Sequence, residues 1–143
     1  MSSLNSRLSG KKVQKICKTC AAPFTPRCNS QRFCAKPCGY ENRKADAALR
    51  FWARVVFQSE TGCQIYTGYL APEGHGKVWW FGRTEQAHRI AWELTNGPIP
   101  EGMCVLHNCP GGDQAACVNV QHLWLGDRAA NNADRDAKGR TAK

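Results

Sequence analysis

"CVLHNCPGGDQAACVNVQHLWLG", residues 104–126, holds three of the nine cysteines and two of the four histidines in a chain of 143 residues. Cys109, Cys117 and His122 are separated as metal ligands are in a loop folded around one ion. His107 lies only two residues before Cys109. The stretch therefore predicts either one crowded metal site or two sites with different tasks that share a loop.

The composition predicts an ordinary domain with a small attached module and a polyanionic partner. Twenty Lys and Arg against eleven Asp and Glu give a net charge of +9, as is typical of nucleic-acid-binding proteins, although solubility alone could also account for it. No apolar run approaches the roughly 18 residues of a membrane span, so we expect no membrane partner. Clustered cysteines without a secretory leader indicate a reducing cytoplasm, where they bind metals more often than they form disulfides.

Local patterns divide the chain into four parts and predict an α+β fold. Residues 1–15 are polar and basic, and they are predicted to form a flexible arm. Residues 16–40 carry five cysteines but few large apolar side chains, so this module needs a metal in place of a core. Helical spacing predicts a connecting helix over 41–56, and mixed strand and helix patterns fill 57–140.

The patterns within 57–140 predict short strands and two helices. We expect a hairpin of residues 62–70 and 78–82 around the turn 71–77, in which Trp80 faces away from Trp79 and Phe81. The other predicted elements are a helix from Thr84 or Glu85 to Asn96, strands at 103–107 and 122–126, and a helix from Asp127 to Lys138. Gly97 and Gly139 are predicted to end the two helices.

The N-terminal cysteines have the spacing of a four-cysteine zinc site. "CKTC" at 17–20 and "CAKPC" at 34–38 form two knuckles that together complete a tetrahedral, structural site. We interpret Cys28 as a bystander, with an exchange for Cys34 as the alternative. The predicted ligands are Cys17, Cys20, Cys34 and Cys38. The surrounding lysines and arginines favour contact with a nucleic-acid backbone, and docking to a protein partner is the alternative.

The cysteines of the opening stretch need a further ligand. Cys109, Cys117 and His122 supply three groups, whereas a closed zinc site has four. The nearest unassigned cysteines are Cys63 and Cys104, and His107 could also complete the set. Closure by Cys63 would join the beginning of the domain to its end.

The segments "VLHNC" and "ACVNVQHLWLGDRAANNADRDAKGR" resemble the HNH endonucleases of bacteriophages and mobile introns, with the added cysteines of the His-Cys box homing endonucleases. "GCQIYTG" and "AHRIAWELTNGPIPEG" fit the same pattern, so the resemblance covers about residues 48–140. It implies a ββα-metal (His-Me finger) core at about 103–138, in which two strands and a helix grip one divalent cation. The N-terminal cysteine pairs resemble the zinc knuckles often joined to such nucleases.

The resemblance also implies roles for individual residues. His107 would be the general base, Arg89 would lie against the scissile phosphate, and Asn131 would bind the catalytic Mg²⁺ (or Mn²⁺). Asn119 would brace the loop or orient His107. The structural zinc of the nuclease domain would be held by Cys63, Cys109, Cys117 and His122, which gives two zinc ions per chain.

One position departs from the family pattern. Many HNH enzymes have an Asp metal ligand before the base, where this chain has Leu106. The catalytic metal would then be held mainly by Asn131, water and DNA oxygens. Val120 also stands where the phage pattern usually has Pro.

The implied activity is hydrolysis of double-stranded DNA that leaves 5′-phosphate and 3′-hydroxyl ends, in a host-cell cytoplasm, by a phage- or mobile-element-encoded protein. A homodimer is expected if both strands are cut. The alternative is a zinc-ribbon DNA-binding protein without nuclease activity; homing, restriction and packaging roles remain open. The expected DNA contacts are Lys77, Arg83, Arg128, Arg135, Lys138 and Arg140.

Overall fold

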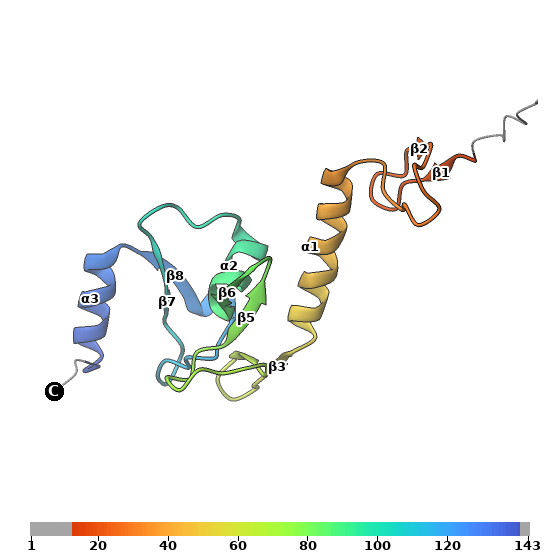
Figure 1. Ribbon diagram of the computed structural model, residues 1–143. Helices are drawn as coiled ribbons and strands as arrows, with labels where there is room; N and C mark the ends of the chain where they lie inside the picture. Colours follow the sequence, from red (N-terminus) through yellow and green to blue (C-terminus); the bar gives the residue numbers. More distant parts are fainter. Residues whose placement is uncertain (1–12, 141–143) are drawn as a thin grey trace, which may run out of the picture. The chain divides into compact units, whose positions relative to one another are not determined.

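The computed structural model describes residues 13–140, and the chain divides into two compact units between Ala47 and Ala48 (Figure 1). Most of the predicted flexible arm, residues 1–15, lies outside the described residues. Its last residue, Lys15, belongs to a strand. Within residues 13–140 no helix is both long and apolar enough to cross a membrane.

The N-terminal unit has very little regular structure. Strands β1 (Lys15–Ile16) and β2 (Pro23–Phe24) pair antiparallel, and helix α1 (Lys36–Trp52) begins in this unit. Among residues 13–47 Cys17 is the one hydrophobic side chain that is buried. The unit therefore has no apolar core, and its loops converge on cysteines instead.

Helix α1 is shifted from its predicted position at 41–56. It begins at Lys36, because Pro37 is tolerated in a first turn, where its missing N–H would have no partner. It ends at Trp52, because Val55–Phe57 forms strand β3, which pairs antiparallel with β4 (Gln64–Tyr66). The β-branched Val55 and Val56 favour the strand over a continued helix.

The aromatic strand pairs differently from the prediction. Strand β5 (Lys77–Trp80) pairs with β6 (Arg83–Gln86) around Phe81 and Gly82, whose φ angles of 45° and 93° suit a two-residue hairpin. The predicted partner segment, 62–70, supplies β4, and it meets the start of β5 through the bridge between Leu70 and Gly76, where the Lys77 N–H donates to the Tyr69 carbonyl over 2.8 Å. The nearer partner forms the hairpin, and the predicted start of the next helix becomes β6.

The remaining elements agree closely with the prediction. Helix α2 (Ala87–Asn96) ends at Gly97, whose φ is 89°. Strands β7 (Cys104–His107) and β8 (Leu123–Gly126) pair antiparallel, with the short 3-10 helix η1 (Val120–His122) just before β8. Helix α3 (Arg128–Ala137) is capped by Asp127, whose side chain accepts the Ala130 N–H. The β7–β8 hairpin lies between α2 and α3 (Figure 1).

One hydrophobic core supports the C-terminal unit. Its buried members are Phe51, Tyr66, Ala87, Ile90, Ala91 and Val118. Trp80 packs against this cluster whereas Trp79 is 72% exposed, which confirms that the two face opposite ways. Phe81 departs from the predicted alternation, because it lies in the turn and its ring centroid is 5.2 Å from that of Trp80. A Cβ at Gly76 would lie 2.7 Å from Tyr66 Cδ1 and 2.8 Å from the Ala87 Cβ, so only glycine allows this close packing.

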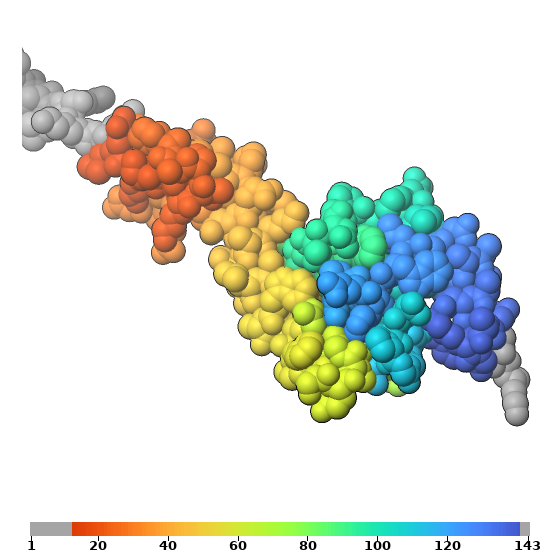
Figure 2. Space-filling view, turned by 180° about the vertical axis from the view of Figure 1, so that it is seen from behind, coloured from red at the N-terminus to blue at the C-terminus, as the bar shows by residue number. Residues whose placement is uncertain are grey.

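Segments that are far apart in the sequence meet on one face of this unit. In Figure 2 the yellow-green residues that follow α1 lie beside the blue residues that precede β8. The Val118 N–H donates to the Gln64 carbonyl over 2.7 Å, and the Tyr66 N–H donates to the Ala116 carbonyl over 2.9 Å. These bonds hold the segment around Cys117 against β4, next to Cys63.

Candidate functional site

A cleft of about 260 Å³ collects polar side chains from three elements of the C-terminal unit. His107 stands at the end of β7, Arg89 in the first turn of α2 and Asn131 in the first turn of α3. All three line the cleft, together with His75, His88 and Asp134. The structure therefore brings together the three side chains that the sequence assigned to base, phosphate contact and metal ligand.

The ring of His107 has a defined orientation. Its Nε2 lies 3.0 Å from the carbonyl oxygen of Cys117, and because a carbonyl only accepts, Nε2 carries the proton and donates. The neutral ring then has an unprotonated Nδ1. Burial lowers the pKa of His107 below its ordinary value, so the neutral ring prevails near pH 7.

Two further histidines surround His107. Their ring centroids lie 5.9 Å (His75) and 4.7 Å (His88) from that of His107. His88 is 4% exposed, and burial lowers its pKa to about 3, so it stays neutral. It is packed and hydrogen-bonded to the Val105 backbone, but its Nδ1 has no partner among the described residues. Sequence reasoning missed His75, because a histidine between two glycines in a turn carries no periodic signal.

The helices hold Arg89 and Asn131 in place. The Nε of Arg89 lies 3.2 Å from Oε1 of Glu85, which restrains the guanidinium at the cleft. Asn131 is half-buried and lines the cleft, whereas the adjacent Asn132 is exposed. Leu106 is 8% exposed, so an apolar side chain occupies the place of the family's Asp.

An ion-pair network closes one side of this cleft. The Nζ of Lys138 donates to the His107 carbonyl over 2.7 Å and lies 2.8 Å from Asp113 Oδ2 and 2.7 Å from Asp134 Oδ1. Arg140 contacts the same two carboxylates at 3.0 and 2.9 Å. Lys138 and Arg140, two of the predicted DNA contacts, are thus each paired with carboxylates, and these pairs tie α3 to the loop after β7.

The other predicted DNA contacts lie on the surface of this unit. Lys77 pairs with Glu73 at 4.0 Å, Arg83 with Glu85 at 3.3 Å, and Arg135 with Asp136 at 3.4 Å. Arg128 is exposed and makes no ion pair with any residue in the range 13–140. Most of these cations are therefore partly neutralised by a neighbour.

The four predicted cysteines of the N-terminal unit lie together. Cys17, Cys20, Cys34 and Cys38 place their Sγ atoms within 4.8 Å of one another. The Cys34 Sγ is 3.6 Å from those of Cys20 and Cys38, close to the roughly 3.8 Å between two sulfurs of a tetrahedral zinc site. The backbone N–H groups of Cys20 and Cys34 lower the pKa of Cys17 to about 6, which favours its thiolate.

Cys28 lies apart from this cluster. It is exposed, and its Sγ is 3.3 Å from the Ser30 hydroxyl. The four clustered thiols therefore form a complete set without it, and the geometry does not favour its exchange for Cys34.

The second cluster is formed by Cys63, Cys109, Cys117 and His122, also within 4.8 Å of one another. The Nδ1 of His122 is 3.5 Å from Cys63 Sγ and 3.8 Å from Cys117 Sγ, close to the roughly 3.6 Å expected around tetrahedral zinc. Burial raises the pKa of Cys109 to about 12, so a bound cation has to displace its proton.

The other candidate ligands lie outside this second cluster. Cys104, on β7, lies opposite Gly126 of β8 and lines the cleft. His107 also lies outside the cluster, although it is bonded to the Cys117 carbonyl. Residues 104–126 therefore contribute to two separate candidate sites, the second cysteine cluster and the cleft, which meet at Cys117.

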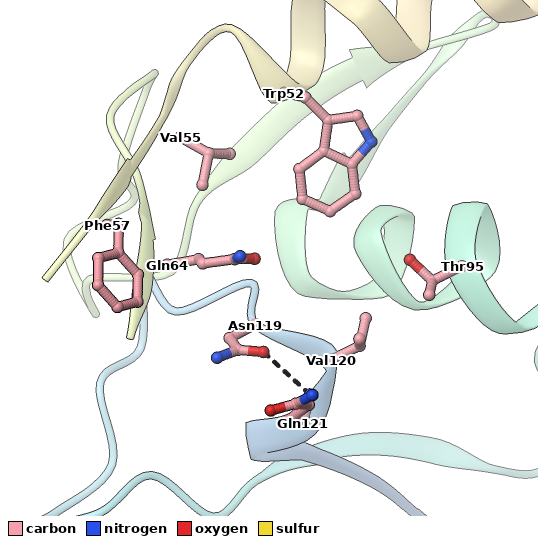
Figure 3. Close-up of a pocket in the computed structure, with 8 residues that line it drawn as sticks. All are labelled: Trp52, Val55, Phe57, Gln64, Thr95, Asn119, Val120 and Gln121. Carbon is pink, nitrogen blue, oxygen red and sulfur yellow. Dashed lines mark hydrogen bonds between the residues drawn. The ribbon is translucent and has the colours of Figure 1, made fainter. Parts of the chain in front are cut away.

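Asn119 lies away from the cleft. It lines a different hollow, between the end of α1, β3 and η1 (Figure 3). Its Nδ2 donates to the Gly62 carbonyl over 2.8 Å, and its Oδ1 accepts the Gln121 N–H over 3.1 Å. The structure thus does not bring Asn119 together with His107 and Arg89, and these two bonds fasten η1 to the residue before Cys63.

Comparison with known proteins agrees with this geometry. Residues 85–133 match the family model of the HNH endonucleases. The chain is similar to Protein 7.7 of Escherichia phage T7, with 40% identity over 57% of this chain and 60% of that protein. It is also similar to Protein 2.8 of the same phage, with 33% identity over 59% of this chain and 57% of that protein. The matched regions thus span somewhat over half of these relatives. No solved structure matches the chain significantly.

Proposed function

We propose that the protein hydrolyses phosphodiester bonds of double-stranded DNA in the cleft lined by His107, Arg89 and Asn131, since residues 85–133 match the family model of the HNH endonucleases. The convergence of these three side chains from β7, α2 and α3 is the observation that carries the proposal. A phosphate in this cleft would meet a base, a cation and an amide oxygen at the same time.

His107 acts as the general base. Its Nε2–H is bound to the Cys117 carbonyl, so Nδ1 is the nitrogen that takes a proton from the attacking water. The same carbonyl stabilises the imidazolium that results. Because the buried ring is neutral near pH 7, it is ready to accept that proton without a prior ionisation step.

Arg89 orients the phosphate. Glu85 holds its Nε at 3.2 Å, which leaves the terminal nitrogens of the guanidinium free for phosphate oxygens. A fixed cation at this place lowers the energy of the charged pentacovalent phosphate. The expected products carry 5′-phosphate and 3′-hydroxyl ends.

The cleft also offers oxygen donors that suit Mg²⁺. The Asn131 amide and the Asp134 carboxylate both line it, and Asp134 is shared with Lys138 and Arg140. When bound, Mg²⁺ supplies positive charge at the phosphate and at the leaving 3′ oxygen. Because Leu106 is apolar, we propose that Asn131 is the principal protein ligand.

We propose that zinc occupies both cysteine clusters and is structural in each. Four donors that all lie within 4.8 Å of one another can fill the four positions around zinc, which leaves none open for water. In the nuclease domain the ligand Cys117 also provides the carbonyl that orients His107. That zinc would therefore hold the base, while Asn119 braces the same segment from the other side.

A plasmid-nicking assay with Mg²⁺ tests the proposal. His107→Ala should lower the cleavage rate by about 100-fold or more, the usual contribution of a general base, while both zinc ions and the far-UV spectrum are retained. Asn131→Ala should lose activity, whereas the exposed neighbour Asn132→Ala should retain it. A wild-type protein no faster than His107→Ala would instead identify a zinc-containing DNA-binding protein without nuclease activity.

A further inference from the structure

The N-terminal unit contains a large groove of its own, of about 900 Å³. One wall is the loop that follows β2, with Arg27 and Phe33. The other wall is the beginning of α1, where Lys36 and Arg43 lie seven residues apart and thus on the same face of the helix. Three exposed cations line this groove, and no carboxylate does.

The groove has a braced wall and a packed base. Gln31 spans the loop, because its Oε1 accepts the Arg27 N–H over 2.7 Å and its Nε2 donates to the Phe33 carbonyl over 2.9 Å. Phe33 packs on Gly39, where an added Cβ would lie 3.4 Å from the ring. The loop that carries Arg27 is therefore held against the helix that carries Lys36 and Arg43.

The positive charge of the chain is also distributed unevenly. Between residues 48 and 140, six of nine lysines and arginines lie within 4.0 Å of a carboxylate. Between residues 13 and 47 there are seven such cations and two acidic residues, and none of the seven makes an ion pair with a described residue. The unpaired cations are therefore concentrated on the N-terminal unit.

We propose that this groove binds the phosphate backbone of duplex DNA and anchors the chain on its substrate. Arg27, Lys36 and Arg43 are the phosphate contacts, and each replaces condensed counterions on the DNA. The nuclease domain then contributes the cleft, while the N-terminal unit contributes most of the salt-dependent affinity. The inference takes its ligand from the proposed function, but binding is measured separately from cleavage.

The test uses the full-length His107→Ala chain, loaded with zinc, and a fluorescent duplex of about 30 base pairs, long enough for both units. The groove variant carries Arg27→Gln, Lys36→Gln and Arg43→Gln. The matched control carries Lys18→Gln, Arg32→Gln and Lys44→Gln, which remove the same charge from the same unit outside the groove. Anisotropy titrations over a range of salt concentrations give the affinity and its salt dependence.

The groove variant should bind at least about 10-fold more weakly, and its slope of log K against log salt should be shallower by about 2 to 3, roughly 0.9 per lost phosphate contact. The control should change the slope by less than about 1. Equal losses in both triple variants, or no loss in the groove variant, would overturn the proposal. If the groove variant does not retain two zinc ions, Arg27→Gln alone decides, with an expected slope change of about 1 against none for Arg32→Gln.

This result is independent of the nuclease test. Plasmid nicking by chains with an intact His107 reports on the cleft, so a failure of the groove leaves the proposed hydrolysis standing. Conversely, an inactive wild-type chain that still shows the predicted slopes would retain the groove and lose only the catalytic proposal.

Discussion

The two cysteine clusters have nearly the same donors but opposite surroundings. In the N-terminal unit Cys20 is exposed, and the described residues of that unit include no apolar core. In the C-terminal unit Cys63 and Cys117 are 0% exposed, and Cys117 is followed by Val118, a member of the hydrophobic core. The first cluster thus takes the place of a core, whereas the second is attached to one.

If zinc occupies both clusters, as proposed, this difference predicts a different role for each ion. Where no core exists, the binding free energy of zinc is the folding free energy of the unit. Where a core exists, most of the domain can fold through burial of Phe51, Tyr66 and Ile90, and the ion has the narrower task of shaping the loop around His107. Replacing one ligand in each cluster should therefore have separate consequences.

The largest expected effect is on cleavage by Cys117→Ser. Loss of this ligand frees the segment whose carbonyl holds His107, and a displacement of about 1 Å can cost about 100-fold in rate. Cys20→Ser should instead weaken DNA binding but leave the rate at saturating DNA within about 10-fold, since the cleft is intact. Single-turnover cleavage and zinc content per chain are the measurements.

Each variant should retain one zinc of two. If Cys20→Ser reduces the saturated rate as strongly as Cys117→Ser, the N-terminal unit contributes to the chemistry and the contrast between the clusters fails. If Cys117→Ser cleaves normally, the second cluster does not position the base.

The second prediction concerns the use of positive charge in the two units. Lys138→Ala removes the bond to the His107 carbonyl and leaves Asp113 and Asp134 with Arg140 alone. We expect the saturated cleavage rate to fall by about 10- to 100-fold, while DNA affinity changes by less than about 3-fold. Arg135→Ala, on the exposed side of α3, is the matched control and should leave the saturated rate unchanged, because Arg135 pairs with Asp136 and not with the loop around His107.

The opposite result would restore the role expected from sequence. A loss of DNA affinity with an unchanged saturated rate would make Lys138 a phosphate contact. The comparison between the units would then weaken, because both would present cations to the DNA.

Spacing along the chain predicted which side chains form the two cysteine clusters better than it predicted strand pairing. Local sequence is enough to predict the cysteine knuckles at 17–20 and 34–38 and the capped helix after Asp127, because neighbouring residues form them. The strand pairing of β5 and the ion pairs of Lys138 and Arg140 depend instead on which of several possible partners the fold brings close. Those choices are made by tertiary contacts that no local pattern records.

The cleft illustrates the same limit. Resemblance identified His107, Arg89 and Asn131, and they do converge. His75 was missed, and of the two roles expected for Asn119, bracing the loop and orienting His107, its bonds to Gly62 and Gln121 favour the first. A side chain's neighbours across the fold decide both cases, and one sequence does not contain them.

The third prediction concerns acid, which should destabilise the C-terminal unit through His88. His88 has a folded pKa of about 3 and faces His75, His107 and Arg89, so below pH 6.5 the unfolded chain takes up a proton that the folded chain does not. Through this residue, the free energy of unfolding of the C-terminal unit should thus decrease by about 1.4 kcal/mol for each unit that the pH is lowered between pH 6 and 4. The N-terminal unit has no histidine between residues 13 and 47, so its acid response comes from protonation of the cysteine thiolates proposed to bind zinc.

Urea unfolding followed by tryptophan fluorescence measures this, since all five tryptophans lie between residues 52 and 124. His88→Gln should flatten the pH dependence, whatever its effect at pH 7. An unchanged slope in the variant would show that other groups, such as the thiolates of the second cluster, dominate the acid response.

The smallest effects should come from a matched pair of glycines. At Gly76 a new Cβ would lie 2.7 Å from Tyr66 Cδ1 and 2.8 Å from the Ala87 Cβ, both in the core, so Gly76→Ala should destabilise the C-terminal unit by about 1–3 kcal/mol.

At Gly39, within α1, the nearest atom is Phe33 Cδ2 at 3.4 Å, an ordinary contact. Gly39→Ala should then gain helix propensity of about 0.5–1 kcal/mol. Because zinc binding and folding are coupled in that unit, the gain should appear as a zinc affinity raised up to about 5-fold in chelator competition. A loss of affinity would mean that Phe33 cannot yield, and that the N-terminal unit is packed as tightly as the core it was contrasted with.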